Sequence, residues 1–229
     1  MDPLNLKKLN SARAKREGAV LLTNLGDGRD RLIREGEEVA GALGEAVEKA
    51  MRSGKSGVFK GGEDEFFINA HVPPGRIVVI GAVHISQALA PMAAIAGFDV
   101  AIIDPRTAFA TPERFAGVDL HAEWPEEVLR EMPLDRYTAL AAVTHDPKID
   151  DFPLAEAIRA GCFYVGALGS RKTHGKRVER LKQAGLTDEQ LATIAAPIGL
   201  DIGAASPAEI AVATLAQIIE AFRRRGLAS

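Results

Sequence analysis

The sequence predicts an α/β protein in which a Rossmann-like, doubly wound parallel sheet follows a small N-terminal α+β lobe. Beyond residue 73, short and almost wholly apolar runs alternate with helical stretches, as in parallel sheets whose strands are covered by helices on both faces. At 71–76, the segment HVPPGR places two prolines and a glycine between this region and a differently patterned one. We therefore expect two domains, residues 1–72 and 73–229.

The N-terminal lobe is expected to be a compact mixture of helices and antiparallel strands. The apolar positions Val39, Leu43, Val47 and Met51 recur every four residues and predict a helix over 36–54. The other predicted elements are a helix at the chain start, a strand at 18–25, a turn at 26–30 and a hairpin at 57–70 that turns at Gly61 and Gly62.

The second domain is expected to alternate strands and helices along its whole length. Its predicted strands cover 76–81, 98–104, 118–122, 137–146 and 162–170, and its first predicted helices cover 84–96, 125–132 and 151–161. Capping-box spacing then predicts helix starts at Thr187 and Ser206. One local conflict is Pro91, which removes a hydrogen bond inside the first helix and predicts a kink.

Composition and charge exclude several classes of protein. The 229 residues carry a net charge of −3, which argues against a dedicated nucleic-acid binder. Cys162 is the single cysteine, so no internal disulfide can form. With neither a membrane-span run nor a signal-peptide core in the sequence, we expect a cytoplasmic protein.

Catalytic and metal motifs are missing from the sequence. The five histidines show no pair with zinc-site spacing, and there is no nucleophile elbow or Walker loop. We therefore assign no catalytic residue and no metal ligand.

The end of the first strand of the sheet resembles a dinucleotide fingerprint that has lost two of its three glycines. Gly81 still permits the tight turn, but Val83 and Ser86 stand at the other two glycine positions. Ligands of open α/β sheets bind at the carboxyl ends of the strands. The candidate contacts from this strand are Gly81, Ala82 and His84.

Asp104 and Arg106 follow the second strand. Asp104 lies slightly more than twenty residues after Gly81, the spacing at which an acid contacts a ribose hydroxyl. The alternative is that Asp104 caps the turn before Pro105. Arg106 could pair with a phosphate, with Asp104 or with solvent.

The fourth and fifth strands deliver more polar groups to the same edge. Thr144, His145 and Asp146 follow the fourth strand, and Gly166 and Gly169 lie at the end of the fifth. His145 is the best candidate for ligand contact or proton transfer.

The stretch GSRKTHGKRVERLK is the strongest candidate for anion binding. Ser170 is the expected N-cap, and Arg171, Lys172 and His174 fall in the first turn. Free backbone N–H groups at a helix start bind anions. Because positive charge there opposes the helix dipole, we favour an anion site over a solvated basic helix.

Five segments together resemble the C-terminal Rossmann domain of the XdhC/CoxI family. They are GAVHISQALAPMA, DPR, THDPKID, YVGALGSRKTH and APIGLDIGAASPAEIAVA. The resemblance covers residues ~72 to 225. It implies a chaperone that binds molybdenum cofactor (molybdopterin), presents it to a sulfurase and inserts it into the apoenzyme of a molybdenum hydroxylase such as xanthine dehydrogenase or carbon monoxide dehydrogenase. In this interpretation GSRKTH holds the phosphate, while His145, Asp146 and Asp201 face the rest of the ligand.

The resemblance is weakest at the front of the chain. Longer family members carry a larger N-terminal domain with a GGC-type segment whose cysteine is proposed to contact the cofactor. The comparable region here, residues 34–51, has no cysteine. With this shortened N-terminal region, the chain could act with a separate N-terminal-domain protein of the family, or it could be a nucleotide-binding half that has lost the metal-facing part. Possible edge strands in the N-terminal lobe are compatible with a homodimer.

Two other functions remain open. The first is an NAD(P)-dependent oxidoreductase that uses Gly81, Asp104 and Arg106 for its nucleotide, and the second is a nucleotide-sensing regulator without turnover. The missing glycines weaken the oxidoreductase hypothesis, and the resemblance to the family favours a non-enzymatic chaperone.

Overall fold

A computed structural model describes residues 1–62 and 64–225, and its chain divides into two compact units. Unit 1 comprises Met1–Pro73 and unit 2 comprises Pro74–Arg225. Each unit is described by itself.

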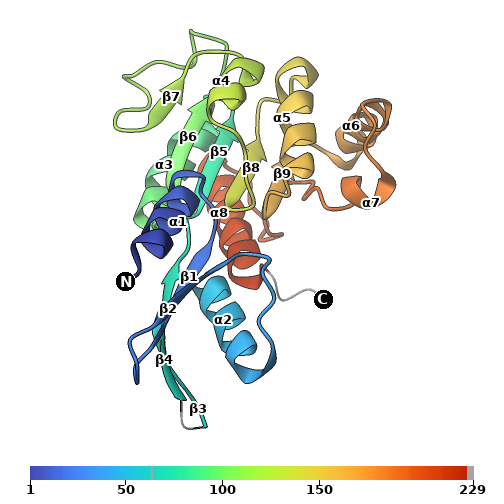
Figure 1. Cartoon of the computed structure of the whole chain (residues 1–229). Helices are drawn as coiled ribbons and strands as arrows, with labels where there is room; N and C mark the ends of the chain where they lie inside the picture. Colours follow the sequence, from blue (N-terminus) through green and yellow to red (C-terminus); the bar gives the residue numbers. More distant parts are fainter. Residues whose placement is uncertain (63, 226–229) are drawn as a thin grey trace. The chain divides into compact units, whose positions relative to one another are not determined.

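Unit 1 is a four-stranded antiparallel sheet with two helices (Figure 1). The strand order is β2-β1-β4-β3. The elements are α1 (Pro3–Ala14), β1 (Ala19–Asn24), β2 (Asp30–Arg34), α2 (Gly41–Ser53), β3 (Gly57–Gly61) and β4 (Asp64–His71).

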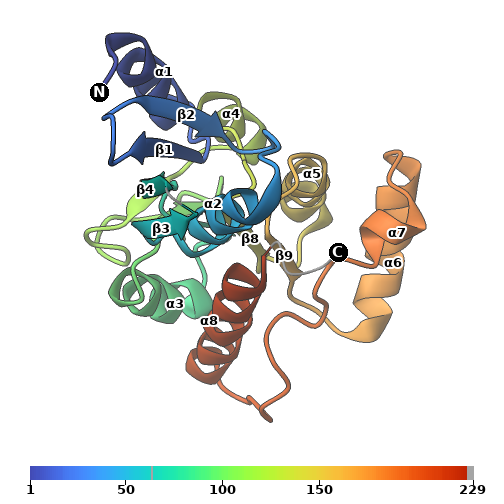
Figure 2. The ribbon, with the colours of Figure 1, turned by 60° about the horizontal axis from the view of Figure 1, so that its bottom comes forward.

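The two faces of the unit 1 sheet carry separate apolar clusters. Successive residues of a strand point to opposite faces. Accordingly Val20 of β1 packs in the cluster that includes Val47 of α2, while Leu21 packs with Leu9 of α1. Figure 2 shows these strands with α1 and α2 beside them.

Two predictions for unit 1 were wrong in their boundaries. The predicted turn is followed by a strand that the sequence analysis missed, β2, which pairs with β1 along its whole length. The predicted helix over 36–54 begins only at Gly41, because left-handed φ values of 86° at Gly36 and 71° at Gly41 prevent a continuous right-handed helix before that point. The predicted first helix, first strand and hairpin are confirmed.

Unit 2 contains a five-stranded, wholly parallel sheet with the order β7-β6-β5-β8-β9. This confirms the Rossmann-like doubly wound sheet. Its strands are β5 (Arg76–Ile80), β6 (Asp99–Ile103), β7 (Asp119–His121), β8 (Thr138–Ala142) and β9 (Tyr164–Ala167). Its helices are α3 (His84–Ile95), α4 (Pro125–Glu131), α5 (Pro147–Arg159), α6 (Arg171–Gln183), α7 (Asp188–Leu191) and α8 (Pro207–Arg224).

Helices cover both faces of the parallel sheet (Figure 1). Ile77 and Val79 of β5 pack on one side, in a cluster with residues of α3 and α8. Val78 and Ile80 pack on the other side, against α4, α5 and α6. Double coverage explains why these strands are apolar without alternation.

Some boundaries in unit 2 differ from the predictions. Helix α5 begins at Pro147 rather than at 151, because Asp146 caps it and Pro147 occupies the first turn. The residues between Val143 and Asp146 therefore form a turn instead of the end of a strand. Helix α3 continues through Pro91, and the capping boxes of α7 and α8 are both formed.

The strand order reverses at β5, since β6 follows it on one side and β8 lies on the other. Such a switch point is where open α/β sheets bind ligands. Among the described residues, no helix is long and apolar enough to cross a membrane.

Candidate functional site

The turn after β5 is held by its neighbours. Gly81 has φ 121°, and a Cβ there would lie 2.8 Å from Cγ2 of Thr144. The buried Ser86 hydroxyl donates to the Gly81 carbonyl. Ser86, at the position of the fingerprint's third glycine, thus fastens the turn from inside the protein.

Asp104 is engaged within the protein. Its carboxylate is 0% exposed and accepts the Ala82 N–H at 2.7 Å. Arg106 donates to it from Nε at 2.9 Å and from Nη2 at 2.7 Å. Burial alone would raise the pKa of Asp104, but these hydrogen bonds outweigh it and hold the pKa below its ordinary value. The geometry favours the turn-capping role over contact with a ribose.

Arg114 fastens the same turn, and the sequence analysis did not single it out. Its Nη1 donates to the carbonyls of Ala82 at 3.0 Å and Phe109 at 2.7 Å, and its Nη2 donates to Gln87. No sequence motif marks Arg114, because its partners are mostly backbone groups. His84 is exposed at the first position of α3.

The turn after β8 is organised by Asp150, which the sequence analysis also missed. Asp150 accepts the Thr144 hydroxyl at 2.7 Å and the His145 N–H at 3.0 Å. These bonds hold His145 at φ 68°, a left-handed conformation that costs about 1–3 kcal/mol in a residue with a side chain. Asp146 caps α5 by accepting the Lys148 N–H at 3.0 Å.

The two glycines at the end of β9 serve close packing. A Cβ on Gly166 would lie 2.8 Å from Cγ1 of Ile198. Gly169 has φ 135°, and a Cβ there would lie 3.7 Å from Nδ1 of His145. The structure therefore brings His145 beside the start of α6.

The first turn of α6 differs in detail from the prediction. Ser170 is the N-cap as predicted, and its hydroxyl accepts the Thr173 N–H at 3.3 Å. Lys172 faces a cavity, whereas Arg171 is exposed outside it. His174 is half-buried outside the cavity lining, and Asp201 is exposed in the loop before α8.

A cavity of about 340 Å³ lies between the N-terminal part of α5 and the side of α6 that runs from Lys172 to Arg180. It is lined by His145, Pro147, Asp150, Asp151, Lys172, Thr173, Lys176, Arg177 and Arg180. The basic lining follows α6 at helical spacing, from Lys172 through Lys176 to Arg180. The spacing of these basic residues by four positions, visible in the sequence, would have predicted that they share one face of the helix.

Arg177 is the most unusual member of the lining. It is 2% exposed, and its Nη2 donates to the Leu168 carbonyl at 3.0 Å. Asp150 Oδ2 lies 4.0 Å from Nη2, too far for a hydrogen bond. Within the described residues, Nε and Nη1 of Arg177 are buried with no hydrogen-bond partner. Each such unsatisfied donor costs about 1–3 kcal/mol, which an anion in the cavity could offset.

The other charges of the lining leave it net positive. Arg180 donates to both carboxylate oxygens of Asp151, so that pair is neutral. Lys172 and Lys176 form no ion pair within the described part of the chain. The cavity can therefore attract an anion, and the N-termini of α5 and α6 add favourable dipoles.

Three titratable groups surround Arg177. Burial raises the pKa of Asp150 to about 6, against the opposing hydrogen bond from Thr144 and the charge of Arg177. Burial, with a smaller contribution from Arg177, lowers the pKa values of His145 and His174. An anion placed here would favour the protonated form of all three groups.

Anion binding should therefore strengthen as the pH falls. Inorganic sulfate remains doubly charged throughout and is a suitable probe. We expect the Kd of sulfate to fall as the pH is lowered from about 8 to 5.5, most steeply near pH 6. For each proton that the site takes up on binding, the Kd should fall by at most about tenfold per pH unit. Titration calorimetry measures this, and Asp150→Asn should flatten the dependence. A Kd that is constant or rises toward acid pH would contradict it.

The single cysteine is remote from this cavity. Cys162 precedes β9, whereas the cavity lies at the carboxyl ends of the parallel strands. Burial raises the pKa of its thiol to about 12, which disfavours the reactive thiolate at neutral pH. Among the described residues, no three His, Cys, Asp or Glu side chains are grouped to hold a metal ion.

Comparison with known proteins identifies relatives of unit 2. Residues 77–218 match the family model described as the XdhC Rossmann domain. YqeB of Escherichia coli K12 is 32% identical over 70% of the chain, and a Bacillus subtilis protein named as a probable xanthine dehydrogenase subunit is 32% identical over 69%. The molybdenum cofactor insertion chaperone PaoD of Escherichia coli K12 is 30% identical over 64%. The alignments span only 30%, 46% and 40% of these three relatives.

A solved structure shares the fold. A crystal structure of a protein named as a xanthine dehydrogenase of Bacillus halodurans aligns with 99% of the chain and 66% of its own length. Its TM-score is 0.65 at 23% sequence identity, so the likeness concerns the fold alone.

Proposed function

The chain belongs to the XdhC family by its Rossmann domain, and from this premise we propose that it is an accessory protein that binds molybdenum cofactor and assists its insertion into a molybdenum hydroxylase. One relative is named as a cofactor insertion chaperone and another as a probable xanthine dehydrogenase subunit, and both names support this role. The role requires a site that holds an anionic cofactor and later releases it.

The buried Arg177 beside a basic cavity is the observation that carries the proposal. Molybdopterin ends in a phosphate, and the residues present fit that group. Arg177 has unsatisfied donors, while Lys172, Lys176 and the hydroxyl of Thr173 also line the cavity. In the proposal the phosphate lies between α5 and α6, with Ser170 and Gly169 shaping the rim. In the proposal the remainder of the cofactor extends toward the turns that carry His84 and His145.

The cavity lining offers no thiolate to the molybdenum end of the cofactor. Cys162, the single cysteine, is half-buried away from the cavity, and burial raises the pKa of its thiol. We propose that the chain presents the cofactor to a sulfurase and to the apoenzyme. A separate N-terminal-domain protein of the family or a second copy of the chain could supply the metal-facing groups.

An NAD(P)-binding role has less support from the geometry. A dinucleotide would need Asp104 for its ribose, but both oxygens of Asp104 already accept hydrogen bonds within the protein. Val83 also places a branched side chain where the pyrophosphate approaches the backbone. The same features weigh against a regulator that senses dinucleotides.

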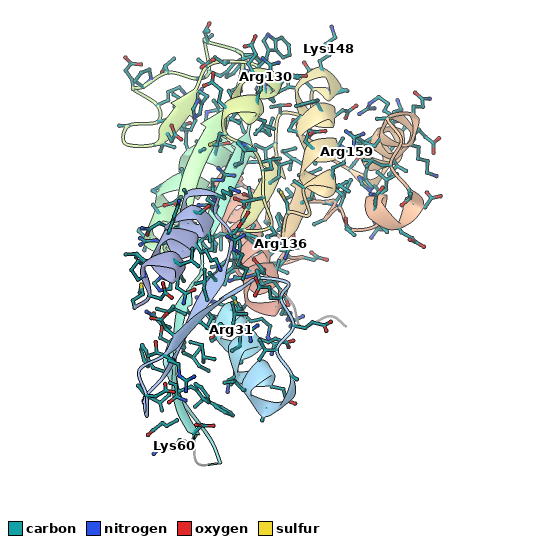
Figure 3. All side chains as sticks on the ribbon, viewed as in Figure 1. Arg31, Lys60, Arg130, Arg136, Lys148 and Arg159 are labelled. Atoms are coloured by element: carbon teal, nitrogen blue, oxygen red, sulfur yellow. The ribbon has the colours of Figure 1, made fainter. Side chains whose placement is uncertain are left out.

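Native mass spectrometry of the protein produced in cells with intact molybdopterin synthesis tests the proposal. We expect a retained mass equal to a molybdopterin species. Lys172→Gln with Lys176→Gln should lose it, while Lys148→Gln should keep it, because Lys148 is exposed on α5 outside the cavity lining (Figure 3). Retention of NAD(P), or of no ligand under any condition, would contradict the proposal.

A further inference from the structure

The charged side chains around the cavity between α5 and α6 form two oppositely charged pairs and, among the described residues, leave two lysines without an acidic partner. Arg180 neutralises Asp151 through two hydrogen bonds. Arg177 and Asp150 balance each other in charge at 4.0 Å without a hydrogen bond. Lys172 and Lys176 remain, and within the described residues neither forms an ion pair. The lining thus carries two positive charges beyond its paired groups.

The two surplus lysines lie on one face of α6. Residues four apart on a helix are neighbours, and Lys172 and Lys176 both line the cavity while remaining exposed. Because both side chains are exposed, their ammonium groups stay hydrated, and therefore charged, in the ligand-free protein. Arg177, which is 2% exposed, also lines the cavity, and its Nε and Nη1 have no hydrogen-bond partner among the described residues.

From this balance we propose that the cavity selects a terminal phosphate monoester, which carries two negative charges, over a singly charged phosphodiester. The inference rests on the proposed function and sharpens it. The preferred cargo is a cofactor that ends in its own, unbridged phosphate. A doubly charged group neutralises both lysines, whereas a diester leaves one of them uncompensated and a bridged oxygen unable to accept strongly.

Three small probes separate charge from shape. Phenyl phosphate is a dianion at about pH 8, since the second pKa of a phosphate ester is about 6. Phenyl sulfate has nearly the same shape with one charge, and methyl phenyl phosphate is the corresponding diester. Titration calorimetry on the full chain should show phenyl phosphate binding about tenfold or more tightly than the other two.

The lysine variants test the cause of the preference. In Lys172→Gln with Lys176→Gln, the preference should shrink to about threefold or less, while Lys148→Gln should leave it unchanged. These positions are exposed, so circular dichroism should show a native fold for every variant. Equal binding of the three probes, no binding of phenyl phosphate, or a preference that survives the double substitution would each overturn the inference.

The outcomes for the inference and for the proposed function are distinguishable. If the chain prefers phenyl phosphate but never retains molybdopterin, the inference stands and the proposed function fails. If the chain retains molybdopterin but shows no preference among the probes, the proposed function stands and the inference fails.

Discussion

Replacing Arg177 with glutamine is expected to weaken the binding of molybdopterin and of phenyl phosphate by about two orders of magnitude. Arg177 is 2% exposed beside the cavity, and its Nε and Nη1 are buried without partners in the described structure. A hydrogen-bonded charge pair in such a desolvated place contributes about 2–5 kcal/mol to binding, much of it as the penalty for leaving one partner alone. Calorimetric titration of the purified variant measures the loss.

A second substitution separates binding from stability. Asp150 is 1% exposed, and the Arg177→Gln substitution removes the cation nearest to its carboxylate. The single variant should therefore also lose about 3 kcal/mol of folding free energy at neutral pH. Adding Asp150→Asn removes the uncompensated charge and should restore much of the stability. It should not restore anion binding. If the folded double variant bound phenyl phosphate as tightly as the wild-type protein does, the assignment of Arg177 as the anion-binding group would be contradicted.

Replacing Asp104 with asparagine is expected to destabilise unit 2 by about 3 kcal/mol. The buried carboxylate joins the turn after β5 to the loop after β6, through the Ala82 N–H and the Arg106 guanidinium. An asparagine can accept only part of these bonds, and its amide N–H groups would face other donors. Denaturant unfolding followed by circular dichroism measures the change.

The pH dependence identifies the charge as the cause. Because the pKa of Asp104 lies below its ordinary value in the folded chain, its contribution is present above about pH 4, the unfolded value, and is lost as the pH falls through the folded pKa. The difference in unfolding free energy between the wild-type protein and the Asp104→Asn variant should therefore disappear only at acid pH. Asp201→Asn, an exposed control, should change the unfolding free energy by less than about 0.5 kcal/mol. A large gap that persists in strong acid would show that the ion pair is not the cause.

The fold of unit 2 could be predicted because its pattern is local. A strand covered on both faces needs an apolar run such as RIVVI, and such segments alternating with helices leave few topologies. Strand β2 was missed because only Leu32 and Ile33 in it are buried, so its pairing with β1 rather than its composition makes it a strand. The late start of α2 depends on two glycine conformations that composition does not reveal.

The site could be predicted only in part, because its chemistry depends on contacts between distant segments. Lys172 and His145, which both line the cavity, were predicted as ligand contacts from a helix start and a strand end. Arg177 stands in a helix whose sequence indicates a solvated element, and only the packing of α5 against α6 buries it beside Asp150. Asp104 had the spacing of a ribose ligand, yet the structure satisfies it with Arg106, two residues along the chain.

Displacement of the bound cofactor tests the central claim most directly. Phenyl phosphate is titrated into the complex of the full chain with molybdopterin, and cofactor release is followed by native mass spectrometry. If the phosphate end of the cofactor occupies the cavity beside Arg177, phenyl phosphate should displace molybdopterin competitively, whereas phenyl sulfate should do so only at much higher concentration. Formation of a ternary complex in which phenyl phosphate and molybdopterin bind together without affecting each other would contradict the account.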